Sequence, residues 1–261
     1  MVKRANYGID APGQVRGLAL FGALATLAGL CSWFVRWRMG VGPGRDLLWP
    51  LLSIGAAFFA SSLLMVWASK VGKFRVRDRL LDAVALEGNE HVLDVGCGRG
   101  LALIGAAKCL TTGRATGIDL WSSKDLSVNT PAAALANAAL EGVAERVVID
   151  TGDMCAMPYA DDTFDAVVSM TAIHNVPTRA RRDLALKEIL RVLKPGGRLA
   201  IFDIFHPFRY LNVLRGCGAT QVKGSRLIFL WALPGRCLFA RKPCPTIAGA
   251  ARAGASIERS R

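Results

Sequence analysis

Three aspartates stand beside short apolar runs in the middle of the chain. Asp94 comes two residues before the first glycine of Gly96-Cys97-Gly98, and Asp119 and Asp153 lie at the ends of the next two runs. If these runs are neighbouring parallel strands, the carboxylates share the edge of the sheet at which open α/β sheets bind ligands. Such a rim favours a positively charged ligand. The simpler alternative is that the three aspartates form turns and cap helices.

The glycine turn narrows the kind of ligand. Backbone without side chains at Gly96 and Gly98 lets a nucleotide-like molecule lie across the strand end, and the next helix offers free N–H groups. A dinucleotide fingerprint requires a third glycine where the chain has Leu101, and an acidic residue before the turn would repel a pyrophosphate. S-adenosylmethionine (SAM) carries an ammonium and a sulfonium instead. The expected contacts to SAM are Asp94 with the amino group, Asp119 with the ribose hydroxyls and Asp153 with the adenine amine.

The elements that must position these residues alternate between strands and helices. This alternation predicts an α/β fold in which a mostly parallel sheet is covered by helices on both faces. Two further strands without a helix between them indicate that one of the two is antiparallel. The predicted strands cover 91–95, 114–119, 147–150, 164–170, 197–203, 219–230 and 236–241, and the helices cover 101–110, 131–142 and 179–193.

Five stretches in this order resemble the class I SAM-dependent methyltransferases, in particular the small-molecule branch that includes the ubiquinone and menaquinone biosynthesis methyltransferases. The resemblance covers roughly residues 75–243. The stretches are Val92-Leu93-Asp94-Val95-Gly96-Cys97-Gly98-Arg99-Gly100, Thr116-Gly117-Ile118-Asp119, Gly152-Asp153-Met154 with Met157-Pro158, Phe164-Asp165-Ala166-Val167-Val168-Ser169, and Arg191-Val192-Leu193-Lys194-Pro195-Gly196-Gly197-Arg198-Leu199.

The resemblance implies a Rossmann-like sheet of seven strands, with the last strand antiparallel, and a methyltransferase that uses SAM as its cofactor. Met154 would supply a backbone N–H near the adenine. Trp121 is a candidate to stack on the adenine ring or, equally, to pack against a helix. The implied cofactor-binding residues are Asp94, Gly96, Gly98, Asp119, Asp153 and Met154.

A catalytic base is needed only for some acceptors. Methyl transfer from a sulfonium is an in-line displacement with an activated leaving group, so the enzyme mainly aligns the nucleophile and excludes water. A base helps when the acceptor is a hydroxyl or a carbon acid, and histidine is the side chain best suited to this near neutral pH. His174, just after the strand 164–170, is the predicted catalytic residue. It could equally be a structural histidine that caps a loop, and His206 is a weaker candidate.

The first eighty residues predict a helical hairpin that spans a membrane. Gly17–Val35 is a run of 19 residues without a charge, and Leu47–Ser69 is a second run of 23. A hydrocarbon core of ~30 Å requires about 20 apolar residues in a helix, so each run is long enough to span it. The alternatives are two buried core helices or a cleaved signal peptide. The predicted organisation is a membrane anchor at 1–74 with spans at 17–35 and 47–69, a methyltransferase domain at 75–243 and a disordered basic tail at 244–261.

The net charge of +13 is concentrated at the two ends of the chain. Residues 1–80 hold 11 Lys/Arg and 3 Asp/Glu, residues 241–261 hold 5 and 1, and the middle holds 17 and 16. A nearly neutral catalytic segment argues against a nucleic-acid partner. The basic cluster after the second run exceeds that of the connecting loop, which predicts two spans with the catalytic domain in the cytoplasm. The seven cysteines and three histidines show no metal-ligand spacing, so no metal site is expected.

The acceptor is expected to be a small molecule that is lipid-like or quinone-like. The segment from Ile204 to Phe208 is too short to form a lid, so the hairpin and the apolar stretch Leu227–Leu233 are expected to hold the open face of the site near the bilayer, where such an acceptor enters laterally. In the alternative, the hairpin only tethers and 227–233 belongs to the sheet core. Two other functions stay open, a catalytically inactive SAM-binding membrane protein and a nucleic-acid or protein methyltransferase.

Overall fold

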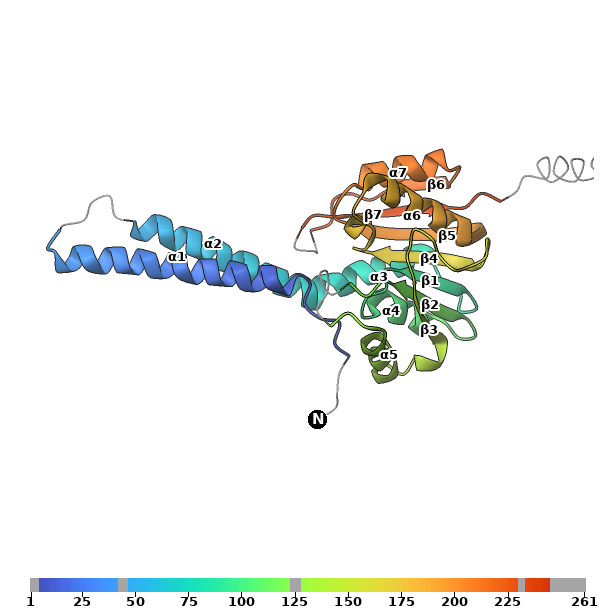
Figure 1. The fold of residues 1–261 in the computed structure, drawn as a ribbon, viewed down its shortest axis with the longest axis horizontal. Coiled ribbons are helices and arrows are strands. Elements are labelled where there is room, and N and C mark those ends of the chain that lie inside the picture. Colours follow the sequence, from blue (N-terminus) through green and yellow to red (C-terminus); the bar gives the residue numbers. More distant parts are fainter. Residues whose placement is uncertain (1–4, 42–46, 123–127, 230–232, 245–261) are drawn as a thin grey trace, which may run out of the picture.

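The computed structural model describes residues 5–41, 47–122, 128–229 and 233–244. They form a long helical hairpin that projects from one end of an α/β domain (Figure 1). Apart from Cys244, the predicted tail 244–261 lies outside the described residues, as do residues 230–232 of the apolar stretch 227–233.

The hairpin consists of α1 (Pro12–Arg38) and α2 (Leu48–Trp67). Small residues allow the two backbones to approach closely: a Cβ added at Gly22 would lie 3.1 Å from the carbonyl oxygen of Gly55, and one at Gly55 would lie 2.3 Å from Thr26 Oγ1. The chain continues from α2 through a π-helical turn, η1 (Ala68–Gly72), into α3 (Lys73–Val84).

The outer surface of the hairpin is apolar and exposed. Pro12–Arg38 and Leu48–Val84 are long and apolar enough to cross a membrane, and only 11% and 17% of their most apolar stretches is buried inside the molecule. Large apolar side chains such as Phe21, Leu24 and Leu63 are more than half exposed. Most of the surface of these two stretches is thus not covered by the rest of the described chain.

The sheet has seven strands in the order β3-β2-β1-β4-β5-β7-β6. Among them β7 runs opposite to the other six and pairs antiparallel with β5 and β6, so the predicted mostly parallel sheet is confirmed. The strands are β1 (His91–Val95), β2 (Arg114–Asp119), β3 (Val147–Thr151), β4 (Phe164–Met170), β5 (Leu193–Asp203), β6 (Thr220–Gly224) and β7 (Arg236–Arg241).

The strand predicted at 219–230 is wrong beyond Gly224, where β6 ends. The pairing of β6 with β7 is already irregular between Thr220 and Lys223. At Ser225 the side chain replaces a strand partner, because its Oγ accepts the N–H of Cys237 at 3.0 Å. Within the residues that the structure describes, an isolated bridge between Ile228 and Gly235 extends the pairing.

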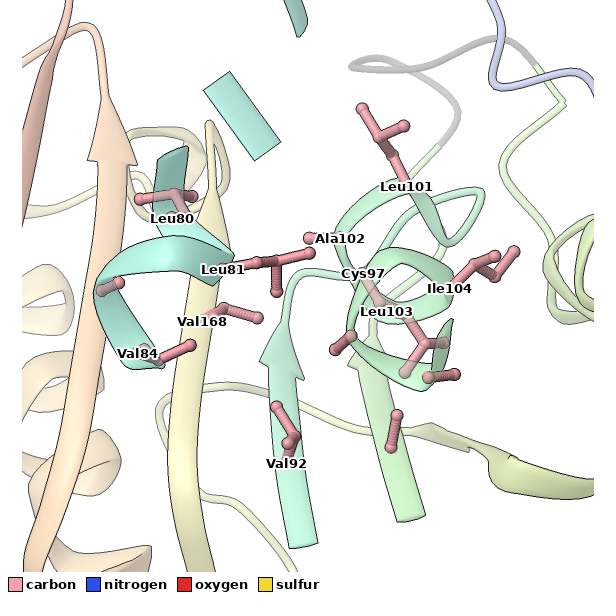
Figure 2. Close-up of a cluster of buried hydrophobic side chains, with 14 of the residues drawn as sticks. Leu80, Leu81, Val84, Val92, Cys97, Leu101, Ala102, Leu103, Ile104 and Val168 are labelled. Atoms are coloured by element: carbon pink, nitrogen blue, oxygen red, sulfur yellow. The ribbon is translucent and has the colours of Figure 1, made fainter. Parts of the chain in front are cut away.

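Helices cover both faces of the sheet, as expected. On one face α3, α4 (Leu101–Cys109) and α5 (Pro131–Leu140) share a core with side chains such as Val92 and Val168. On the other face α6 (Arg179–Val192) and α7 (Pro207–Gly216) share a second core with Leu93 and Val167, the strand residues next to Val92 and Val168 in the sequence. Figure 2 shows the first core, in which Leu80, Leu81 and Val84 of α3 lie over the strands. Two short 3-10 turns, η2 (Ala144–Arg146) and η3 (Ile173–Asn175), complete the elements.

Candidate active site

A cavity of about 620 Å³ opens at the carboxyl ends of the central strands. Its walls are the ends of β1, β2 and β4, the segment 152–154 after β3, the turn η3, and the short connection between β5 and α7. Parallel pairing sets these strand ends level with one another, since Val95 is opposite Ile118, Asp119 is opposite Thr151 and Met170 is opposite Phe202. The residues predicted to bind the cofactor therefore meet around one space.

The glycine turn forms the floor of the cavity. Gly96 N and Cys97 N both donate to the carbonyl of Ile118, at 2.8 and 3.2 Å, which ties the turn to β2. Gly96 has φ +74, and an added Cβ would lie 2.2 Å from the Cβ of Ala172, so this position accepts no side chain. Gly98, also in the left-handed region with φ 53, donates its N–H to Asp119 Oδ2 at 2.9 Å.

Asp94 is buried beneath the turn, with 2% of its surface exposed. Its Oδ2 accepts the N–H of Leu103 in the first turn of α4, at 2.8 Å. Desolvation raises the pKa of Asp94 to about 7, with a further contribution from the negative charge of Asp119. Within the described residues no cationic side chain pairs with Asp94. A bound cation would therefore stabilise its ionised form.

Asp119 and Asp153 line the same cavity, and both are held by hydrogen bonds. Asp119 Oδ1 accepts from the N–H of Trp121 at 2.7 Å. Asp153 Oδ1 accepts from Cys155 N at 2.9 Å, and its Oδ2 contacts the guanidinium of Arg181. Burial opposes ionisation of Asp153, but the hydrogen bonds from Cys155 and the charge of Arg181 outweigh it and hold the pKa below its ordinary value.

The remaining predicted residues divide between the cavity and its surroundings. Met154 lines the cavity. Trp121 is not part of the cavity wall. Its indole Nε1 donates to Thr151 Oγ1 at 2.8 Å, and its ring packs against the core that α3 and α4 share. This position agrees with the alternative that Trp121 packs against a helix. His206 also lies outside the wall, at the N-cap position of α7 with φ 60.

His174 lies in η3 and lines the cavity next to the end of β5. Its ring Nδ1 is 2.5 Å from Asp203 Oδ1, and its backbone N–H donates to Asp203 Oδ2 at 3.1 Å. Asp203 is fully buried, and the ring of Phe205 meets the imidazole edge-on with 5.7 Å between the ring centroids. Because Nδ1 is engaged, Nε2 is the ring nitrogen left to exchange a proton with a molecule in the cavity.

Asp203 belongs to the site although no sequence motif singled it out. A signal was present, because Asp203 is the last residue of a predicted strand, as Asp119 is, and therefore belongs to the same sheet edge. What the sequence could not show is that β5 pairs directly with β4, which brings Asp203 beside a histidine 29 residues away.

The base of the hairpin also contributes to the cavity wall, which no sequence motif indicated. These residues come from the segment that precedes α1, from the first turn of α1, and from the start of α3. They are Tyr7, Asp10, Ala11, Gln14 and Lys73.

The side chains and the glycine turn of this cavity suit SAM. A buried carboxylate without a cationic partner, a turn that excludes side chains, and two further carboxylates meet a molecule that is cationic, nucleotide-like and rich in hydroxyl and amine donors. With SAM bound, Asp94 would lie toward the methionine end, Asp119 toward the ribose and Asp153 toward the adenine. The methyl group to be transferred is supplied by the sulfonium of this cofactor.

Comparisons with known proteins agree with a cavity that binds SAM. Residues 93–201 match the family model described as "Methyltransferase domain". Methyltransferase GfsG of Streptomyces halstedii is 35% identical over 130 residues, which is 50% of this chain and 43% of that protein. Demethylmenaquinone methyltransferase of Lactiplantibacillus plantarum is 36% identical over 132 residues, which is 50% of this chain and 52% of that protein. The chain thus spans about half the length of the curated relatives that it matches.

Solved structures share the fold. The crystal structure of a SAM-dependent methyltransferase from Aquifex aeolicus superposes with a TM-score of 0.51 and 20% sequence identity, and the match covers 63% of this chain and 88% of that chain. At this identity the similarity concerns the fold. Residues 93–201 thus match the methyltransferase-domain family, and the strand order and the glycine turn agree with that match.

Proposed function

We propose that this protein is a membrane-anchored enzyme that transfers the methyl group of SAM to a lipid-like or quinone-like small molecule. The observation that carries the proposal is the continuity between the hairpin and the cavity. Ala11 and Gln14 line the cavity, and the uncharged run of α1 begins at Gly17, less than one helical turn after Gln14. A molecule that leaves the bilayer beside the hairpin would reach the site without crossing water.

Exposed apolar side chains near the mouth of the cavity support the same route. Phe205 and Leu233 line the cavity and are each about half exposed, so the cavity wall on this side is apolar. Phe208, Leu227 and Phe229 add exposed apolar surface on the neighbouring segments. We name the set Phe205, Phe208, Leu227, Phe229 and Leu233 the apolar rim. Apolar surface of this kind favours contact with a membrane or an apolar substrate.

The His174–Asp203 pair supports proton removal from the acceptor during transfer. Asp203 holds Nδ1, so Nε2 of His174 takes the proton from a hydroxyl or an acidic carbon as the nucleophile attacks the methyl group. The buried carboxylate of Asp203 then stabilises the imidazolium that forms. Alignment of the acceptor with the sulfonium is left to the cavity walls.

The same proposal assigns residues 1–74 to the anchor, 75–243 to the catalytic domain and 244–261 to a disordered basic tail. The spans at 17–35 and 47–69 then cross the bilayer, with the catalytic domain on the cytoplasmic side. One curated relative is by its name a demethylmenaquinone methyltransferase, which favours a quinone-like acceptor among the small molecules that the cavity could accept.

The test uses the full chain reconstituted in liposomes that contain the lipid extract of source membranes. After incubation with methyl-labelled SAM, the label is expected in a species that partitions into organic solvent, and mass spectrometry identifies it. The His174→Ala variant should bind SAM and transfer little label. SAM binding without any labelled product, or label recovered in nucleic acid or protein when these are supplied, would contradict the proposal in favour of the inactive or the macromolecular alternative.

A further inference from the structure

Lys73 is a buried cation in the wall of the cofactor cavity. It stands at the start of α3, with 2% of its surface exposed. Its Nζ donates to the backbone carbonyls of Tyr7 and Gly8, at 2.9 and 2.8 Å, and lies 3.6 Å from Asp10 Oδ2. Lys73 therefore holds the segment before α1 across the side of the cavity.

The segment that Lys73 holds is fixed at a second place. The backbone N–H of Asn6 donates to Asn137 Oδ1 at 2.9 Å, and Asn137 Nδ2 donates back to Asn6 O at 3.1 Å. The hydroxyl of Tyr7 donates to Glu141 at 3.3 Å. Contacts with α5 and α3 thus hold the segment in place, and Lys73 and Asp10 lie where it borders the cavity.

The Lys73–Asp10 pair contributes little to stability by itself. Burial lowers the pKa of Lys73 and raises that of Asp10, and the attraction between the two charges only partly offsets this. Buried ion pairs are often no more stabilising than apolar residues of the same volume, because desolvation consumes the Coulomb energy. At 3.6 Å Asp10 is a more distant partner of the Lys73 ammonium than the two backbone carbonyls are.

The methionine end of the cofactor offers the Lys73 ammonium a second anionic partner. Asp94, Asp119 and Asp153 suit the cationic and hydroxyl groups of SAM, but its carboxylate needs a positively charged partner. Three cations line the cavity in the part of the chain that the structure describes, namely Lys73, Arg99 and Arg181. Arg181 is paired with Asp153, and the charges of Lys73 and Arg99 are close enough to interact.

We propose that Lys73 binds the carboxylate of SAM and that Asp10 positions its ammonium for this contact. The base of the membrane hairpin is then part of the cofactor site, and donor recognition depends on the junction between anchor and catalytic domain. This inference rests on the proposed function, because it assumes that SAM occupies the cavity.

The experiment is calorimetric titration of the full chain with SAM, with decarboxylated SAM, which lacks only the carboxylate, and with 5′-methylthioadenosine, which lacks the whole amino acid end. The wild-type protein should bind SAM about tenfold or more tightly than decarboxylated SAM. Lys73→Gln should abolish this preference and leave the affinity for 5′-methylthioadenosine unchanged, whereas Lys73→Arg should retain it. Lys242→Gln, which removes a surface pairing with Asp162, is the matched control.

Several results would overturn the inference. The inference is wrong if the wild-type protein binds SAM and decarboxylated SAM with equal affinity. This measurement does not depend on whether Lys73→Gln folds. Equal weakening of all three ligands by Lys73→Gln would assign the lysine a structural role only. If the wild-type protein bound none of the three, the proposed function itself would fail, which is a different result from loss of the carboxylate preference.

Discussion

Asp203 binds His174 at two points, the ring Nδ1 at 2.5 Å and the backbone N–H at 3.1 Å. A single buried carboxylate thus fixes both the position of the histidine backbone and the orientation of its ring. The pair joins segments at the ends of two adjacent strands and borders the cavity, where the proposed function has the imidazole take a proton from the acceptor.

Asp203→Asn should lower kcat by about 100-fold, because the ring loses its anionic partner, while SAM affinity should not change. His174→Gln should have a similar effect, because it removes the imidazole that takes the proton. Because the two residues act as one unit, the double variant should be no slower than His174→Gln alone. Steady-state kinetics and SAM titration on the three variants test this, and additive losses would contradict a shared role.

SAM binding should weaken below pH 7. The pKa of Asp94 is raised to about 7, chiefly by desolvation, and a cationic ligand prefers the ionised carboxylate. Affinity is therefore full above this pKa and falls by up to about tenfold per pH unit below it, as the carboxyl is protonated. Titration of SAM against pH measures the effect. Asp94→Asn should bind weakly at every pH, and if its affinity still fell below pH 7, another group would be responsible.

Gly96→Ala should destroy SAM binding. The left-handed conformation at φ +74 costs an alanine about 1–2 kcal/mol, and the new Cβ would overlap the Cβ of Ala172 at 2.2 Å. Gly218→Ala is the matched control, because Gly218 has φ +84 but its Cβ would enter open space. Thermal unfolding and SAM titration separate the two effects. Similar behaviour of both variants would show that backbone strain, and not the contact with Ala172, limits the position.

Phe229→Asp should impair use of an acceptor that is embedded in the bilayer. Phe229 is 69% exposed in the apolar rim, and a charge there opposes contact with the hydrocarbon region. We expect KM for a quinone with an isoprenoid chain in liposomes to rise about tenfold, with no change for the same ring without the chain. Leu184→Asp on α6 replaces an exposed apolar residue outside the apolar rim and serves as the control. An equal loss for both acceptors would argue against lateral entry.

The orientation of the catalytic domain can be read from a version of the protein that retains Cys217 as its single cysteine. Cys217 is exposed on the catalytic domain, after α7. An impermeant thiol reagent should leave it unlabelled in intact cells and label it after permeabilisation, because the basic residues after the second span predict a cytoplasmic domain. Labelling in intact cells would reverse the topology.

Local patterns in the sequence were sufficient for the central part of the fold and for one side of the site. The turn at Gly96, the aspartates at the strand ends and the two apolar runs each follow from a few neighbouring residues. Parallel strands place their carboxyl ends at one edge, so Asp94, Asp119 and Asp153 had to meet once the alternation was recognised. The error at 219–230 arose because Ser225 ends the pairing through a side-chain hydrogen bond that strand propensity does not report.

The partners of these residues were decided by the tertiary structure. Asp203 reaches His174 because β5 lies beside β4, and Lys73 reaches the cavity because the start of α3 packs against a segment 65 residues earlier in the chain. No periodicity or turn motif encodes such contacts, since they depend on which surfaces the helices and strands bury together. The sequence by itself determined a glycine turn with a carboxylate rim and an apolar hairpin, while the docking of the hairpin base against the sheet edge decided that the two share one cavity.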